Sequence, residues 1–151
     1  MNKITIREAV REEAPVIADF QVLMAMETEG CSLRHDIIMK GVKAVFEDPA
    51  KGRYFIAEEA GKPLASMLIT PEWSDWRNSF VWWFQSVYVI PEARRRGIFR
   101  MMYNHVREMA EKEGAAGLRL YVEAENSRAQ KTYEAMGMDS THYKMYEWMR
   151  E

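Results

Sequence analysis

The start of the chain has apolar residues that alternate with polar ones and then changes to helical spacing. Ile4 and Ile6 stand between polar neighbours, which predicts a strand over residues 3–10. Acidic residues before Pro15 are typical of a helix start, and Gly30 follows the end of the pattern. The helix itself is indicated by apolar residues that share one face, namely Val16, Ile17, Phe20, Leu23 and Met24.

The middle of the chain predicts a second helix and then three strands. Apolar residues share one helix face from about residue 36, and the Asp48-Pro49 pair ends that pattern. Pro91 stops the last of the three strands, which is long, apolar and rich in aromatic and β-branched residues. The strands are expected over residues 54–58, 64–70 and 80–90, with a turn at 61–63 and an aromatic loop at 73–78.

The last third predicts two more helices and two more strands. Gly97 opens a helix with apolar residues on one side, and Asn126-Ser127 opens another that ends at Gly137. Strands are expected over residues 118–122 and 143–149. The crossover from residue 80 to residue 122 through a helix implies one parallel strand pair. We therefore expect a mixed α/β fold in a single domain, residues 1–151, with a mostly antiparallel central sheet and about four helices.

Composition narrows the classes of function. The net charge of −2 argues against a nucleic-acid-binding protein. The N-terminus lacks a signal-peptide core and no apolar run is long enough for a membrane span, so we expect neither secretion nor membrane insertion. The single cysteine, Cys31, points to the reducing cytoplasm. The histidines lack metal-ligand spacing, so we expect no metal site.

One turn stands out chemically against this mildly acidic background. The chain passes from the strand that ends before Pro91 into a helix that starts at Gly97, and four arginines surround this turn: Arg94, Arg95, Arg96 and Arg100. The first turn of a helix presents unpaired N–H groups, which bind phosphate, and arginine adds charge-assisted hydrogen bonds. The alternative is a solvated basic turn. A nucleotide-phosphate site is disfavoured because neither G-x-x-x-x-G-K-[ST] nor G-x-G-x-x-G occurs.

Two sequence blocks resemble the GNAT superfamily of N-acetyltransferases. In the first, Arg94-Arg95-Arg96-Gly97-Ile98-Phe99 is similar to the family's acyl-CoA pyrophosphate loop at Arg94 and Gly97 and departs from it at Phe99, where a small residue is usual. In the second, residues 122–129 followed by Tyr133 and Gly137-Met138 are similar to the family's pattern of strand, Asn, Ala, Tyr and Gly. The resemblance extends from the first strand to Met138.

The resemblance implies where acetyl-CoA binds. Strands 80–90 and 118–122 would splay apart, and the pantetheine arm would fill the gap. Backbone groups of Val87 and Val89 would pair with it, and the N–H of Val87 or Tyr88 would polarise the thioester carbonyl. Asn126 would contact the cofactor or cap its helix. The pyrophosphate would lie against the turn formed by Arg94, Arg95, Arg96, Gly97, Ile98, Phe99 and Arg100.

The resemblance also implies the catalytic groups. Tyr133 would protonate the departing thiolate; the alternative is a tyrosine that anchors the core. The family often has a glutamate on the strand before the loop, and residues 82–86 lack a carboxylate, so Glu27 or Glu29 at the end of the first helix would be the base. The alternative for both glutamates is a solvated helix end.

The implied activity is transfer of an acetyl group from acetyl-CoA to a primary amine by direct attack. The acceptor is left open between a small amine and a protein amine, and an exposed aromatic strand leaves a homodimer open. A non-catalytic acyl-CoA-binding sensor or regulatory module is the alternative, because it would keep Gly97 and the arginines and would not need Tyr133.

Overall fold

The computed structural model describes residues 2–150. Among them the chain forms five strands and four α-helices. The strands are β1 (Ile4–Glu8), β2 (Arg53–Glu59), β3 (Lys62–Ser74), β4 (Ser79–Val89) and β5 (Gly117–Arg119). The helices are α1 (Ala14–Glu29), α2 (His35–Glu47), α3 (Ile98–Glu113) and α4 (Ser127–Ala135). The contacts divide the chain into two compact units, one up to Leu120 and one from Tyr121.

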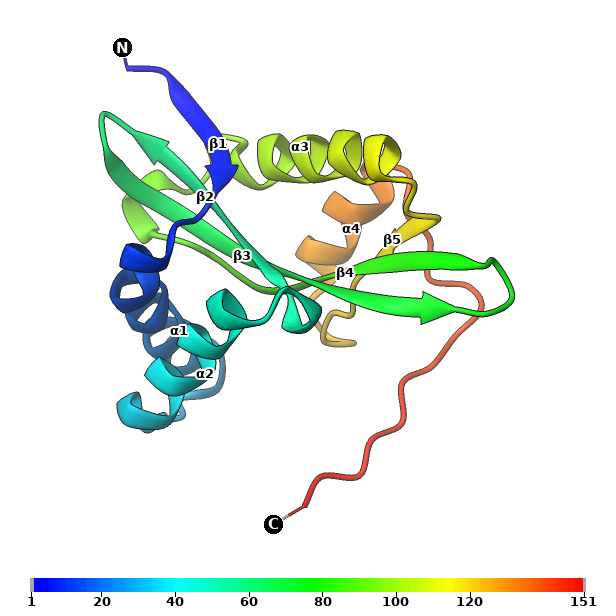
Figure 1. Cartoon of the computed structure of the whole chain (residues 1–151), viewed down its shortest axis with the longest axis horizontal. Coiled ribbons are helices and arrows are strands. Elements are labelled where there is room, and N and C mark those ends of the chain that lie inside the picture. The colour runs from blue at the N-terminus through cyan, green and yellow to red at the C-terminus, as the bar shows by residue number, and fades with distance from the viewer. Residues whose placement is uncertain (1, 151) are drawn as a thin grey trace. The chain divides into compact units, whose positions relative to one another are not determined.

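The strands of the first unit form one mixed sheet in the order β1-β2-β3-β4-β5 (Figure 1). The first three neighbouring pairs are antiparallel, and β4 pairs with β5 in parallel. This confirms the expected mixed α/β class with one parallel pair. Within residues 2–150, no helix combines the length and the apolar character needed to cross a bilayer.

Helices cover both faces of this sheet because its central strands are apolar on both sides. On one face, α1 and α2 form a buried cluster with Tyr54 and Ile56 of β2. On the other face, the ring of Phe55 lies 5.9 Å from that of His105 in α3. Side chains of successive strand residues point to opposite faces, which explains why neighbouring residues of β2 serve different helices. In Figure 1, α1 and α2 lie on one side of the sheet and α3 lies on the other.

A β-bulge interrupts β4 between Gln85 and Tyr88. Leu68 pairs with Gln85 and Ser66 pairs with Tyr88, so β4 has one more residue than β3 over this interval. Ser86 lies within the bulge and has a φ of 52°, which few non-glycine residues adopt. The extra residue reverses which face the following side chains occupy. Phe84 accordingly stacks on Tyr103 of α3, whereas Tyr88 contacts Phe20 of α1.

The parallel pairing of β4 with β5 is short. It joins residues 81–83 to residues 117–119, and β4 continues beyond it to Val89. The predicted strand over 118–122 is therefore shorter and starts earlier than expected. The predicted loop at 73–78 is shorter too, because β3 and β4 pair as far as Ser74 and Ser79. The ring of Trp73 lies 5.0 Å from that of Phe80 and supports this extension.

The second unit contains α4 and an exposed C-terminal segment. The predicted last strand over 143–149 is wrong, because the structure has no strand at these residues. A strand needs a neighbour for its N–H and C=O groups, and a local sequence does not supply one. The large side chains of the segment are exposed to between 58% and 88%: Tyr143, Met145, Tyr146, Trp148 and Met149.

Candidate active site

The turn between β4 and α3 has the backbone geometry of an anion site. Gly97 occupies the N-cap position of α3 with a φ of 74°, and Arg95 also has a positive φ, 66°. The first α-helical bond runs from the N–H of Met101 to the carbonyl of Gly97, so the helix offers no acceptor to the N–H groups before it. A Cβ at position 97 would have no atom within 4 Å, so the space beside Gly97 is open to a ligand.

Two of the four arginines around this turn are held by carboxylates. Arg94 pairs with Glu27 at 2.7 Å, and Arg96 pairs with Glu59 at 2.6 Å. The hydrogen bond to Glu59 raises the pKa of Arg96. Arg95 and Arg100 are exposed and form no ion pair with any residue in 2–150. The turn is therefore positively charged, and half of that charge is balanced locally.

Glu27 connects the end of α1 to this turn. Its carboxylate accepts a hydrogen bond from Arg94 at 2.7 Å and another from the Tyr88 hydroxyl at 3.4 Å. Arg94 also donates to the carbonyl of Val89 at 3.0 Å and lies 5.7 Å from the centroid of the Tyr88 ring. Burial, followed by the charge of Glu27, raises the pKa of Tyr88. Four residues named from the sequence are thus brought together here: Glu27, Tyr88, Val89 and Arg94.

The remaining residues of the turn differ in exposure. Ile98 is buried under the start of α3, and Val87 is half-buried. Phe99, the departure from the family pattern, directs its ring to those of Phe84 and Tyr103, at 6.2 Å and 6.3 Å. The aromatic side chain is therefore accommodated by packing against β4 and α3.

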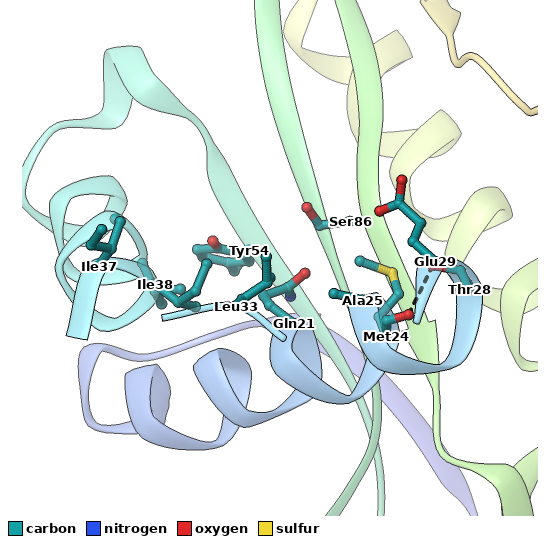
Figure 2. Close-up of a pocket in the computed structure, with 12 residues that line it drawn as sticks. Gln21, Met24, Ala25, Thr28, Glu29, Leu33, Ile37, Ile38, Tyr54 and Ser86 are labelled. Atoms are coloured by element: carbon teal, nitrogen blue, oxygen red, sulfur yellow. Dashed lines mark hydrogen bonds between the residues drawn. The ribbon is translucent and has the colours of Figure 1, made fainter. Parts of the chain in front are cut away.

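A cavity of about 460 Å³ lies between α1, α2 and the strands β2 and β4 (Figure 2). Glu29 and Ser86 both line it, so the cavity reaches the bulge of β4. Glu27 does not line it, and the structure thereby separates the two candidate bases. The other lining residues are Gln21, Met24, Ala25, Thr28, Leu33, Ile37, Ile38, Gly41, Val42 and Tyr54.

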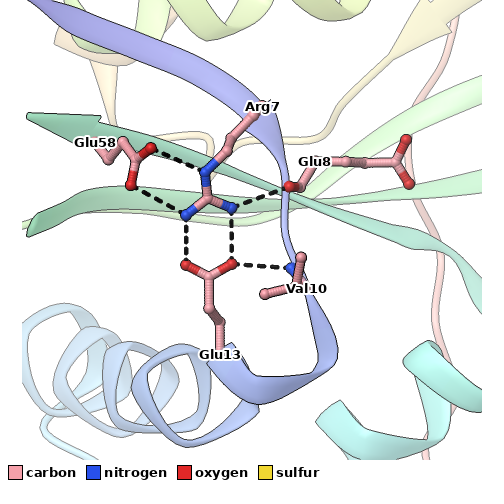
Figure 3. Close-up of polar contacts among 5 residues, drawn as sticks. All are labelled: Arg7, Glu8, Val10, Glu13 and Glu58. Atoms are coloured by element: carbon pink, nitrogen blue, oxygen red, sulfur yellow. Dashed lines mark hydrogen bonds and ion pairs between the residues drawn. The ribbon is translucent and has the colours of Figure 1, made fainter. Parts of the chain in front are cut away.

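The start of α1, whose later turns form one wall of the cavity, is fixed to the sheet by an arginine (Figure 3). Arg7 of β1 donates two hydrogen bonds of 2.8 Å to Glu13 and bonds Glu58 of β2 at 3.0 Å and 3.1 Å. Glu13 also accepts from the backbone N–H of Val10 at 2.9 Å. The hydrogen bond from Arg7 is the main cause of the lowered pKa of Glu13.

Asn126 and Tyr133 belong to the second unit. Asn126 caps α4, because its side chain accepts a hydrogen bond from the N–H of Ala129 at 3.1 Å. Tyr133 is half-buried in α4, and burial raises the pKa of its phenol. Within residues 2–150 no group of three His, Cys, Asp or Glu side chains is arranged to hold a metal ion.

Sequence reasoning missed the cavity and the bulge. One signal for the cavity was present: Gln21 interrupts an otherwise apolar face of α1 between Ile17 and Ala25. The bulge had no comparable signal, because the sequence around Ser86 contains no glycine.

Comparisons with known proteins extend these observations. The profile of the acetyltransferase (GNAT) family matches residues 19–138. The solved structure of a possible acetyltransferase from Clostridium difficile 630 is 44% identical, covers 98% of this chain and 98% of its own, and has a TM-score of 0.91. An aminoglycoside N-acetyltransferase solved in complex with CoA is 16% identical, with coverage of 99% and 97% and a TM-score of 0.79, which shows similarity of fold. No curated protein matches the chain.

Proposed function

This chain belongs to the acetyltransferase (GNAT) family, and from that premise we propose that it transfers an acetyl group from acetyl-CoA to a primary amine by direct attack. The observation that supports the proposal is that two different sites adjoin β4. The arginine-rich turn at Gly97, which follows β4, suits a diphosphate, and the cavity that Ser86 of the bulge lines suits an acceptor.

The turn would hold the diphosphate of the donor. The open space beside Gly97, the N-terminus of α3 and the exposed Arg95 and Arg100 favour an anionic group. Arg94 and Arg96 would add positive charge once they exchange their carboxylate partners, Glu27 and Glu59, for the phosphates. When bound, acetyl-CoA supplies a thioester whose carbonyl carbon accepts the amine.

The C-terminal part of β4 would align that thioester. The N–H of Ile90 donates to the carbonyl of Leu64 in β3, so the backbone groups of Val89 point away from β3, toward the side on which β5 has already ended. Val87 and Val89 would pair with the pantetheine amides there. By the same alternation the N–H of Tyr88 points toward β3, where Tyr88 pairs with Ser66. We therefore propose that the N–H of Val87 donates to the thioester carbonyl, and one such donor contributes about 3–4 kcal/mol.

Glu29 is the base we propose. An alkylammonium acceptor, with a pKa of about 10.4, must lose a proton before it attacks. Glu29 lines the cavity, whereas the carboxylate of Glu27 is engaged by Arg94 and Tyr88. Glu27 would instead hold Arg94 in an ion pair that competes with the phosphates of the donor.

Tyr133 is the proton donor we propose for the departing thiolate. Burial raises the pKa of this phenol, so the group stays protonated at neutral pH and keeps the proton available. Asn126 caps the helix that carries Tyr133, and we propose that it also contacts the cofactor.

The experiment measures free thiol release from acetyl-CoA with a panel of primary amines and, separately, CoA binding by calorimetry. Tyr133→Phe is expected to retain CoA affinity and to lower kcat roughly a hundredfold. Tyr146→Phe is the matched control, because Tyr146 is 88% exposed in the same unit. Unchanged turnover in Tyr133→Phe contradicts the donor role, and CoA binding without thiol release from any amine favours the sensor module.

We also propose that the chain forms one acyltransferase domain and acts in the cytoplasm. The location is supported by Cys31, which is exposed and is the only cysteine of the chain.

A further inference from the structure

Gln21 is a buried polar residue whose amide nitrogen is unsatisfied within residues 2–150. It is 7% exposed, and its amide nitrogen makes no hydrogen bond with any described residue. An unsatisfied buried amide destabilises the fold, and an apolar residue of similar shape would avoid that penalty. A group that lowers stability in the free protein and lines a cavity is typical of a binding residue.

Tyr54 adds a second polar group to the same cavity. Its side chain is 5% exposed, and within residues 2–150 its hydroxyl forms no hydrogen bond. Burial raises the pKa of Tyr54 to about 12, so the phenol is neutral at physiological pH and can donate. Gln21 and Tyr54 together offer a ligand both a donor and an acceptor without any charge.

The rest of the cavity lining is apolar except for one carboxylate and two hydroxyl side chains, Thr28 and Ser86. The hydroxyl of Thr28 already donates to the carbonyl of Met24 at 2.8 Å. Glu29 is the only charged residue, and no lysine, arginine or histidine occurs, among the described residues that line the cavity. A carboxylate in the ligand would lose hydration without gaining a cation, and a second ammonium would face apolar walls. Figure 2 shows Ile37 and Ile38 at the end of the cavity away from Glu29 and Ser86, with Gln21 and Tyr54 between.

From this arrangement we infer that the acceptor is a small primary amine with an apolar body and one neutral hydrogen-bonding group such as a carboxamide. Gln21 selects it by bonding that neutral group. The inference rests on the proposed function, because it assigns the acceptor of the same reaction. Free amino acids, which carry a carboxylate, and polyamines, which carry several ammonium groups, are disfavoured.

The test compares leucinamide with 3-methylbutylamine, which has the same apolar body and lacks the carboxamide. Thiol release gives kcat/KM for each amine with the wild type and with Gln21→Leu. The ratio of the two values is expected to fall roughly fivefold in Gln21→Leu, the effect of one lost hydrogen bond. Because both proteins meet the same two amines, differences in amine pKa cancel from this comparison.

Gln85→Leu is the matched control. Gln85 lies on β4 outside the cavity lining and donates to the Thr70 hydroxyl at 2.7 Å. This variant is expected to keep the ratio of the two amines and to lose thermal stability. Gln21→Leu is expected to keep or raise the melting temperature, because it removes an unsatisfied group.

Leucine and spermidine complete the panel for the wild type. After correction for the fraction of neutral amine, both are expected to give kcat/KM at least about tenfold below that of leucinamide. An unchanged amine ratio in Gln21→Leu, or equal use of leucine, overturns the inference and leaves acetyl transfer intact.

A failure of the proposed function gives a different result. In that case no amine releases thiol although CoA binds, and the cavity is then tested by thermal shift with leucinamide. Stabilisation by leucinamide that is lost in Gln21→Leu still supports the cavity assignment, and its absence in the wild type overturns it.

Discussion

The arginine-rich turn and the cavity lie at opposite chemical extremes, although β4 contributes to both. The turn is exposed, carries four arginines and presents backbone N–H groups at Gly97. The cavity is mostly apolar, with one carboxylate, Glu29, and two buried neutral groups, Gln21 and Tyr54. In the proposed reaction, the charges and backbone N–H groups of the turn would bind the phosphates of the donor, whereas the side chains of the cavity would distinguish one amine acceptor from another.

The end of α1 shows how sharply the two regions are separated. Glu27 and Glu29 are two residues apart, which on a helix is a rotation of about 200°. Glu27 consequently bonds Arg94 and Tyr88 at the turn, and Glu29 lines the cavity. If the regions are separate in function, variants at the turn should change CoA binding alone, and variants at the cavity should leave it unchanged.

Among the variants that test this separation, the largest effect is expected from Gly97→Ala. A residue with a Cβ at a φ of 74° costs about 1–2 kcal/mol, and the new Cβ would occupy the open space beside the turn. The dissociation constant for CoA, measured by calorimetry, should rise at least about tenfold. Gly114→Ala is the matched control, because Gly114 has a φ of 81° at the other end of α3. Equal losses of CoA affinity in both variants would contradict a local role for Gly97.

The second effect is on the free energy of unfolding and is expected from Arg7→Met, which removes the hydrogen bonds that hold the start of α1 against the sheet. Arg7 holds the pKa of Glu13 below its ordinary 4.5, so its contribution is complete above pH 4.5 and disappears as the pH falls through the lower, folded value. Because Arg7 is partly exposed, the loss of unfolding free energy at pH 7 should be about 1–2 kcal/mol.

Urea unfolding at pH 7 and pH 3 measures this effect, and the difference from the wild type should shrink at the lower pH. Arg34→Met removes a more exposed pair with Asp36 and should cost less than about 0.5 kcal/mol. CoA affinity should be unchanged in both variants, and a large change in Arg7→Met would break the separation of turn and cavity.

A smaller effect with the opposite sign is expected from Glu27→Gln. Removing this carboxylate frees Arg94 from its 2.7 Å ion pair, so CoA should bind about threefold more tightly at low salt and the gain should shrink as salt is added. Arg94→Ala should weaken binding several-fold. A Glu27→Gln protein that binds CoA more weakly would show that the ion pair supports the donor site.

The smallest effect is expected from Gly41→Ala in the wall of the cavity. Gly41 lies inside α2, and an added Cβ would have no atom within 4 Å. Alanine should stabilise the helix by about 0.5–1 kcal/mol, measured as a rise in melting temperature, and leave CoA affinity unchanged. A loss of CoA affinity would mean that the cavity and the turn are coupled.

The parts of the fold that follow from local pattern were predictable. Helical spacing gave α1, and the glycine and proline positions marked the turns around β3 and the start of α3. The long-range features were not predictable, because they depend on the count of residues in a partner strand. The bulge at Ser86 exists because β4 pairs with β3 on both sides of an extra residue. The sequence of β4 alone does not show which residues of β3 it pairs with.

The candidate site divides in the same way. The turn was predictable because its chemistry lies within one short segment, from Arg94 to Arg100. The ion pair of Arg94 with Glu27 and the cavity around Gln21 join residues from distant segments, so only the fold reveals them. The incorrect strand at 143–149 has the same cause, since a local sequence can predict a strand without supplying its neighbour.

The extra residue in β4 has a consequence for changes in chain length. Phe84 packs toward α3 and Tyr88 toward α1 only because the chain gains one position between them. Deleting Ser86 would restore simple alternation and turn the Tyr88 ring to the opposite side of the sheet, away from Glu27. Residues 84–88 should therefore tolerate substitutions far better than insertions or deletions. Related sequences should keep the number of residues in this segment even where the residues themselves differ.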